Sequence, residues 1–317
     1  MRFRYSVRFL FYATAVFAVL ALGLRHWMDQ TTFEDIAAEL NRANAKPNVW
    51  DHWNADTFLE DQVKVEHLSG EIPCVGLHFD KIKSQPTLIA ASRVTQATEL
   101  VIRDIDSSLS VSGCDFSHLT DLHLGGATEK QITEWLDATG RLKELSLAFK
   151  NEMSQTDYSR IAAIKSLTVL RLSNVKLSPG DLSDLRRLPR LTHISFYSCE
   201  IEDAVFAELA SFPALNSLEL YGKTCDDHTV RQLRDLSRIH SIDLTSSRVT
   251  DRGVKILSEM THLKHLSLYD CQEITSRCVP DLSEMRFLDW LNVLKSAIEK
   301  DETLNQNPPT QLAEWIM

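Results

Sequence analysis

The stretch Ile239–His262, IHSIDLTSSRVTDRGVKILSEMTH, decides the fold because altered copies of it recur along most of the chain. Its first, fourth and sixth residues are apolar, a pattern that predicts a short strand with one buried face. Further on, Val254 and Leu257 lie three residues apart, which predicts the apolar face of a short helix. Thr250 or Asp251 can cap the start of that helix. The stretch therefore predicts one strand-and-helix unit of a repeat solenoid.

The strand part of this unit recurs about every 24 residues. Eight copies have apolar residues at the first, fourth and sixth positions, and they begin at Leu119, Leu142, Leu167, Leu191, Leu215, Ile239, Leu263 and Leu288. Two earlier stretches, ATELVI from Ala97 and IPCVGL from Ile72, fit the same pattern. A chain of 317 residues could hold two ordinary domains, but a repeat array of this length can be a single body. We expect about 8–10 repeats over residues 71–294.

Segments such as RVTDRGVKIL and EIEDAVFAEL resemble the helix-containing "ITDxGL" variety of leucine-rich repeats, which is shared by cysteine-containing and bacterial repeats. The resemblance covers roughly residues 71–295. It implies a right-handed α/β solenoid with a curved parallel sheet on the concave side and short helices on the convex side. At the turn where that family usually has Asn or Cys, two repeats have Cys199 and Cys271, but others have different residue types. The chain departs from the family pattern at this turn.

The six cysteines show neither a CxxC pair nor the Cys/His spacing of a zinc site. Cys199 and Cys271 occupy the turn position, where a small thiol can be buried and can donate weakly to backbone carbonyls. Cys225 falls in the register of inward-facing residues. We therefore expect buried, unpaired thiols, and a bridge between Cys271 and Cys278 is the alternative pairing.

Residues 1–28 are predicted to be an N-terminal membrane anchor. Residues 9–24 are uncharged and mostly apolar, and a helix of that length rises about 24 Å, against about 30 Å for a hydrocarbon core. More arginines before this segment than after it favour a cytoplasmic N-terminus and extracytoplasmic repeats. A cleaved signal peptide, with a small-residue site at Ala21–Gly23, would instead make the protein secreted. A buried helix of a soluble protein is the third alternative.

Two flanking segments are predicted to cover the ends of the solenoid. Residues 29–70 are expected to form a helical N-terminal cap or linker, in which Pro47 ends the helix. The aromatic and acidic stretch WDHWNADTFLEDQ over 50–62 is interpreted as part of that cap, rather than as a partner-binding patch or a metal site. Residues 295–317 are expected to form a C-terminal helical cap.

The net charge of -10 and the pI near 5.6 argue against a nucleic-acid partner, because phosphate binding needs clustered Lys and Arg. The sequence has no GxSxG, HExxH or P-loop motif. We therefore predict that the protein is not an enzyme and uses no cofactor or metal.

Side chains between the apolar strand residues are expected to form columns on the concave face, because parallel strands stack about 4.8 Å apart. Tyr221 and Tyr269 flank Thr245 in one column, and rigidly held tyrosines are typical recognition residues. The predicted protein-binding patch consists of Tyr197, Tyr221, Tyr269, Glu219, Asp243, His265, His193 and Arg171. The alternative is that Tyr and His merely suit exposed strand positions. Metal binding or acid–base catalysis in this patch is disfavoured, since an open sheet does not exclude water.

Together these features predict a membrane-anchored, extracytoplasmic and non-enzymatic module that binds a protein or peptide on its concave face. One alternative is a structural, envelope-organising protein whose helix faces make the contacts. The helix positions Arg231, Lys255 and Glu259 are charged and mixed in sign, which suits a solvated face better. A cytoplasmic adaptor or regulatory subunit is the alternative if the N-terminal segment is not exported.

Overall fold

The structure is a computed structural model that describes residues 46–48, 62–68, 74–94, 97–149, 155–223, 225–296 and 298. In this part of the chain, one sheet has the strand order β1-β2-β3-β4-β5-β6-β7-β9-β11-β12-β13-β14. Neighbouring strands from β3 to β14 are parallel, as the repeat pattern predicts. The strands of this sheet are β1 (Lys46–Asn48), β2 (Gln62–Leu68), β3 (Cys74–Ile82), β4 (Ala97–Ile105), β5 (Asp121–Ala127), β6 (Glu144–Phe149), β7 (Val169–Ser173), β9 (His193–Tyr197), β11 (Ser217–Tyr221), β12 (Ser241–Asp243), β13 (His265–Ser267) and β14 (Trp290–Asn292).

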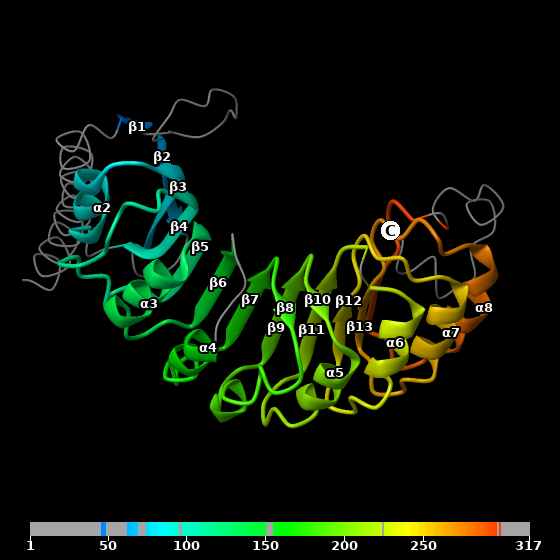
Figure 1. Cartoon of the computed structure of the whole chain (residues 1–317). Coiled ribbons are helices and arrows are strands. Elements are labelled where there is room, and N and C mark those ends of the chain that lie inside the picture. The colour runs from blue at the N-terminus through cyan, green and yellow to red at the C-terminus, as the bar shows by residue number, and fades with distance from the viewer. Residues whose placement is uncertain are drawn as a thin grey trace, which may run out of the picture.

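Short helices connect the strands along the outer side of the sheet. In Figure 1 the stacked strands follow an arc that opens upward, and the helices from α3 to α7 lie along its lower, outer side. The helices are α2 (Gln85–Ser92), α3 (Glu129–Ala138), α4 (Gln155–Ile161), α5 (Asp203–Leu209), α6 (Asp227–Leu233), α7 (Asp251–Ser258) and α8 (Val279–Glu284), with the 3-10 turns η1 (Leu185–Arg187) and η2 (Ser276–Cys278). A second, two-stranded sheet joins β8 (Lys176–Leu177) to β10 (Glu200–Ile201). The described chain is thus a curved parallel sheet with short helices.

The apolar strand positions form the core. All three positions of each of the eight copies from Leu119 onward are buried, for example Ile239, Ile242 and Leu244 at 2% exposure or less. Burying one such side chain stabilises a fold by about 1.5–3 kcal/mol. The helices add their own apolar faces, since Val254 and Leu257 of α7 are also buried. The core therefore runs continuously between sheet and helices, as a solenoid requires.

A residue in the left-handed conformation follows the strand segment in each repeat from β7 onward. These residues are Asn174, Ser198, Gly222, Ser246, Asp270 and Lys295, with φ between 52° and 111°. The N–H groups of the first five donate to the next repeat and keep the stack connected: Ser246 N–H donates to the carbonyl of Tyr269 at 2.8 Å. The turn takes each chain segment out of the sheet and into the connection, which ends the strand.

Polar side chains also link the helix starts of neighbouring repeats. Of the two cap residues that the sequence allowed, Thr250 is the N-cap of α7, and its N–H and hydroxyl donate to the two carboxylate oxygens of Asp227 at 2.8 and 2.7 Å. One repeat later, Thr275 makes the same two bonds to Asp251, at 2.6 and 2.7 Å. Gly253 is required because a Cβ there would overlap the Asp227 carboxylate. A cap threonine and the Asp of the preceding helix start thus form a hydrogen-bonded ladder between helices.

The first repeat has a different register from the one expected. Leu77 pairs with Leu100 and Phe79 pairs with Ile102, so the apolar pattern that starts at Ile72 is displaced by two residues. Leu77 and Phe79 are each 1% exposed. A two-residue shift leaves every side chain on the same face of a strand, so the alternating pattern alone could not distinguish the two registers.

The range 29–70, expected to be a helical cap, contains two strands in its described part, β1 and β2. β2 pairs antiparallel with β3 and adds a hairpin partner to the first repeat. The alternation of Val63 and Val65 with polar residues is a strand signal in the sequence of β2. The expected helix after Thr31, most of the aromatic stretch 50–62 and the C-terminal range 299–317 lie outside the described residues.

The predicted membrane anchor over residues 1–28 also lies outside the described residues. Among the helices that the structure does describe, none has the length and apolar character needed to cross a bilayer.

Cys225, Cys271 and Cys278 agree with the prediction of buried, unpaired thiols, whereas Cys114 is only partly buried. Cys199 and Cys271 are buried, and their Sγ atoms donate to the carbonyls of Leu172 at 3.4 Å and Leu244 at 3.2 Å. Cys278 is free rather than bridged to Cys271. Burial raises the pKa of Cys278 to about 12, so its reactive thiolate is disfavoured.

Candidate functional site

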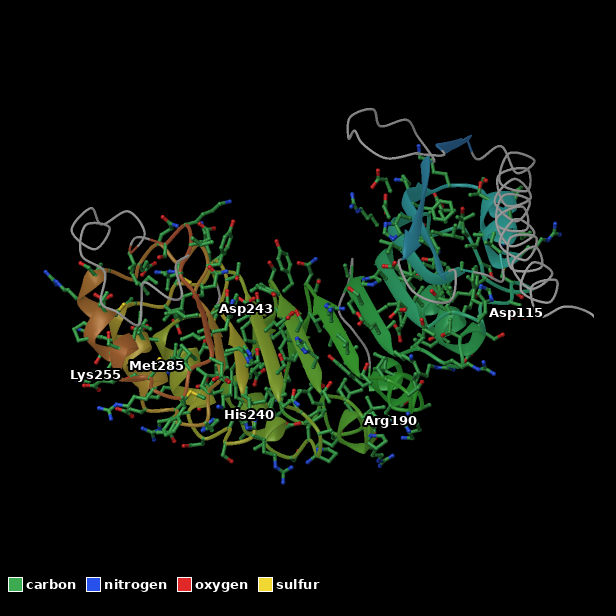
Figure 2. The ribbon with its side chains drawn as sticks, turned by 180° about the vertical axis from the view of Figure 1, so that it is seen from behind. Asp115, Arg190, His240, Asp243, Lys255 and Met285 are labelled. Atoms are coloured by element: carbon green, nitrogen blue, oxygen red, sulfur yellow. The ribbon has the colours of Figure 1, made fainter. Side chains whose placement is uncertain are left out.

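The predicted patch lies on consecutive strands of the concave face. Ser195, Glu219 and Asp243 are directly paired across β9, β11 and β12, and Tyr197 is paired with Tyr221. Figure 2 shows Asp243 on the sheet, with His240 and Arg190 along the lower margin of the molecule. The residues between the buried strand positions therefore do form columns on one face.

Two tyrosines form the aromatic part of the patch. The rings of Tyr197 and Tyr221 are 6.2 Å apart between centroids and tilted by 53°. Tyr197 is 57% exposed, one of the largest exposures of an apolar side chain in the described residues. The Tyr221 hydroxyl donates to Oδ2 of Asp243 at 3.1 Å. Tyr221 is thus held in place, and it supports an exposed neighbouring ring.

His193 and Glu219 form the polar part of the patch. Nε2 of His193 lies 2.9 Å from Oε1 of Glu219 and 3.1 Å from the Ser217 hydroxyl. Burial alone would raise the pKa of Glu219, but His193, Ser195 and Arg171 together lower it below its usual value. The Glu219 carboxylate is therefore kept ionised.

Asp243 has a structural role as well as a place in the patch. Its Oδ1 accepts from the N–H of Thr245 at 2.9 Å and from the Thr245 hydroxyl at 2.6 Å. This local turn ends β12. Burial, followed by the charges of Asp243 and Glu219, raises the pKa of the Tyr221 hydroxyl well above its usual range. Tyr221 therefore stays a neutral donor to Asp243.

The other predicted residues lie on the same face but contact different neighbours. Arg171 pairs with Glu144 on β6 at 2.9 Å. The ring of Tyr269 lies beneath the ammonium group of Lys295, 5.2 Å from the ring centroid. His265 is exposed on β13. The structure thus brings five of the eight predicted residues into one contact group: Tyr197, Tyr221, His193, Glu219 and Asp243.

A second polar group on the concave face was absent from the predicted patch. Glu99, Asp121 and Glu144 occupy directly paired positions on β4, β5 and β6. Nε2 of His78 lies 3.4 Å from a Glu99 oxygen, and Nε2 of His123 lies 4.0 Å from the other. The signal was present in the sequence, because Glu99 occupies the same column as Asp121 once the repeat at Ala97 is included.

The pKa values in this second group shift in opposite directions for one main reason. Burial raises the pKa of Asp121, and repulsion from Glu144 and Glu99 raises it further. Burial lowers the pKa of His123, against the attraction of Glu99. No group of three or more His, Cys, Asp or Glu side chains in the described part of the chain is arranged to hold a metal ion.

Comparisons with known proteins find likeness only at the level of fold. No protein-family model and no curated protein matches the chain. A solved Bacteroides fragilis protein is 18% identical over 64% of this chain and 67% of its own, with a TM-score of 0.47. Internalin C2 from Listeria monocytogenes is 15% identical over 69% of this chain and 79% of its own, with a TM-score of 0.39.

A plant peptide hormone receptor, RGFR1 in complex with RGF2, is 16% identical over 68% of this chain and 46% of its own, with a TM-score of 0.25. The described chain has the curved parallel sheet and short helices that its resemblance to leucine-rich repeats implies.

Proposed function

We propose that the protein is a non-enzymatic binding module whose concave face contacts a protein or peptide around Tyr197. The observation that carries the proposal is the exposed ring of Tyr197, which lies against the fixed ring of Tyr221 on a rigid sheet. A ring held in this way loses little conformational entropy on binding and contributes a large apolar area. Such rings are frequent centres of protein interfaces.

The polar groups around the ring favour binding over chemistry. Glu219 forms a hydrogen bond with His193, and Asp243 accepts hydrogen bonds from Thr245 and Tyr221. These bonds hold each carboxylate in place. Their remaining lone pairs face an open sheet, where they can accept hydrogen bonds from a partner.

The charged composition of the outer surface favours the concave face as the binding surface. Arg231, Arg234, Lys255 and Glu259 are all exposed and mixed in sign. Surfaces of this composition are usually solvated, and charged residues are depleted at the centres of interfaces.

The proposal is tested by comparing two aromatic substitutions of similar exposure. Tyr197→Ala removes a ring on the concave face, while Phe287→Ala removes a 59% exposed ring from the loop before β14. The full chain is tagged, crosslinked in its native cells with a lysine-reactive reagent and purified. We expect the wild type and Phe287→Ala to retain a common protein that Tyr197→Ala loses, with all three melting alike. Retention of that protein by Tyr197→Ala contradicts the proposal.

We further propose that the chain is anchored in a membrane, with its N-terminus in the cytoplasm and its repeats outside. The support is the uncharged apolar segment over residues 9–24, preceded by three arginines. Topology reporters fused after Thr32 and after Met317, together with the mass of the N-terminus, test this. We expect both reporters outside the cytoplasm and Met1 retained. A shortened N-terminus indicates a secreted protein, and a cytoplasmic C-terminus contradicts export.

A further inference from the structure

Apart from Glu144, which is paired with Asp121 and bound by Arg171, the concave face carries two pairs of carboxylates at directly paired strand positions. Glu99 on β4 pairs with Asp121 on β5, and Glu219 on β11 pairs with Asp243 on β12. The backbones of each pair are one strand spacing apart, about 4.8 Å. Negative charge is therefore concentrated at two separate places on one open face.

The arginines of this face are engaged with other carboxylates. Arg171 pairs with Glu144 at 2.9 Å, and Arg103 pairs with Asp80 at 2.9 Å. The nitrogen contacts of the two pairs include imidazoles, such as that of His193, which lies 2.9 Å from Glu219. One hydrogen bond from an imidazole leaves other lone pairs of the carboxylate available to a partner. A cationic partner can therefore complement both pairs.

The second pair also lies beside aromatic rings. Tyr221 follows Glu219 by two residues on the same strand face, and its hydroxyl donates to Asp243. The 57% exposed ring of Tyr197 packs against it. An exposed aromatic face next to carboxylates attracts a Lys or Arg side chain through both cation–π and ionic interactions.

We propose that the partner of the concave face is an extended peptide segment that carries two separated groups of Lys or Arg. The midpoints of the two carboxylate pairs are five strand spacings apart in the sheet order, or roughly 24 Å. An extended chain covers that distance in about seven residues. Between its two basic groups the peptide passes over the salt bridge of Arg171 and Glu144. A further cation would be least stabilised there, because Arg171 already neutralises the Glu144 carboxylate. The inference rests on the proposed binding role of this face and adds the chemistry of the partner.

Two synthetic peptides of equal composition test the spacing. In KKGSGSGKK the midpoints of the two Lys pairs are about seven residues apart, while in GSGKKKKGS the lysines are contiguous. Binding to the full chain is measured by fluorescence anisotropy at low salt. We expect the spaced peptide to bind about 10-fold more tightly, because only it reaches both pairs at once. Equal binding of the two peptides overturns the proposal.

Substitutions in the protein locate the binding. Glu99→Gln removes one charge from the first pair and Glu219→Gln removes one from the second, and both keep the side-chain shape. Each variant should bind the spaced peptide about threefold or more weakly than the wild type does. The difference in affinity between the spaced and the contiguous peptide should become smaller. Glu259→Gln, on the outer side, should change nothing. If a variant fails to fold, a spaced peptide with acetylated lysines replaces it, and wild-type protein should then lose binding. Undiminished binding to Glu219→Gln, or of the acetylated peptide, overturns the proposal.

The crosslinking experiment distinguishes failure of this inference from failure of the proposed function. If the protein crosslinked in a Tyr197-dependent manner has no segment with two spaced basic groups, the charge inference fails while the binding role stands. If no crosslinked protein depends on Tyr197, the binding role fails, and this inference fails with it.

Discussion

The N-terminal repeats, β3 to β6, and the C-terminal repeats, β12 to β14, build the same sheet by different means. The N-terminal strands are six to nine residues long, while each C-terminal strand has three. In the C-terminal repeats Asp227 and Asp251 bind the helix caps of the following repeats, and the left-handed residues Ser246 and Asp270 each donate a backbone N–H to the next repeat. In the N-terminal repeats, backbone pairing over long strands connects the stack, and Gln131 adds side-chain bonds to the carbonyls of Asp106 and Leu109 in the preceding repeat.

The comparison teaches that the repeat consensus encodes the connections between strands more than the strands themselves. Thr250 and Asp251 follow each other at a helix start because each bonds to a neighbouring repeat, and Gly253 leaves room for the Asp227 carboxylate that accepts from Thr250. Long strands need only alternation, and many sequences satisfy it.

The largest expected effect comes from disturbing the backbone contact of the N-terminal repeats. A Cβ at Gly125 would overlap the backbone carbonyl of Arg103, so Gly125→Ala must push β5 away from β4. We expect a loss of about 3 kcal/mol of unfolding free energy, measured by urea denaturation. Gly140→Ala is the matched control, since a Cβ there meets nothing within 4 Å. Equal stability of the two variants would mean that the close strand approach is not needed.

A smaller effect is expected from breaking the C-terminal ladder. Asp251→Ala removes both bonds to Thr275, and we expect it to cost about 1–2 kcal/mol. Asp203→Ala is its control, because Asp203 occupies the equivalent helix position but bonds to His228, with both side chains more than half exposed. That exposed pair should contribute at most about 0.5 kcal/mol. A cost for Asp203→Ala as large as that for Asp251→Ala would remove the distinction between ladder and surface pair.

The smallest effects should differ in sign between two concave carboxylates. The pKa of Glu219 is lowered, so its contribution is present above pH 4.5 and is lost as the pH falls through its folded value. Glu219→Gln should therefore cost about 0.5 kcal/mol at neutral pH and little in acid.

The pKa of Asp121 is raised, so its ionisation costs stability as the pH rises above 3.8 through the folded value. Asp121→Asn should accordingly be neutral or slightly stabilising at neutral pH. Denaturation midpoints of both variants at pH 7 and at acidic pH test the two signs. Parallel pH profiles for the two variants would show that the two carboxylates do not differ in this way.

The sequence predicted most of the fold because periodic apolar residues determine which faces are buried. The strand copies from Leu119 onward and the Thr250 cap follow from that pattern. The register at Ile72 did not, because a two-residue shift is silent in an alternating pattern. The hairpin strand β2 was missed because its alternation is interrupted by His67, which leaves only Val63 and Val65 as apolar positions before Leu68.

The site was predictable as columns but not as contacts. Adjacent positions within a column place Tyr197 beside Tyr221 and Glu219 beside Asp243. The side-chain contacts also depend on the direction in which each side chain points. Arg171 points to Glu144, and the order of residues in the columns does not predict this contact. Glu99 lies outside the predicted patch because that patch is centred on the tyrosines of later strands.

Site-specific photo-crosslinking tests the central claim, that the concave face binds a partner, most directly. A photoreactive amino acid is placed at Tyr197 on the concave face or at Lys255 on the outer helix α7, and the full chain is irradiated in its native cells. The account predicts a discrete crosslinked protein from position 197, its loss when Tyr221→Ala is added, and no such product from position 255. The same product from position 255 alone, or from both positions equally, would contradict it.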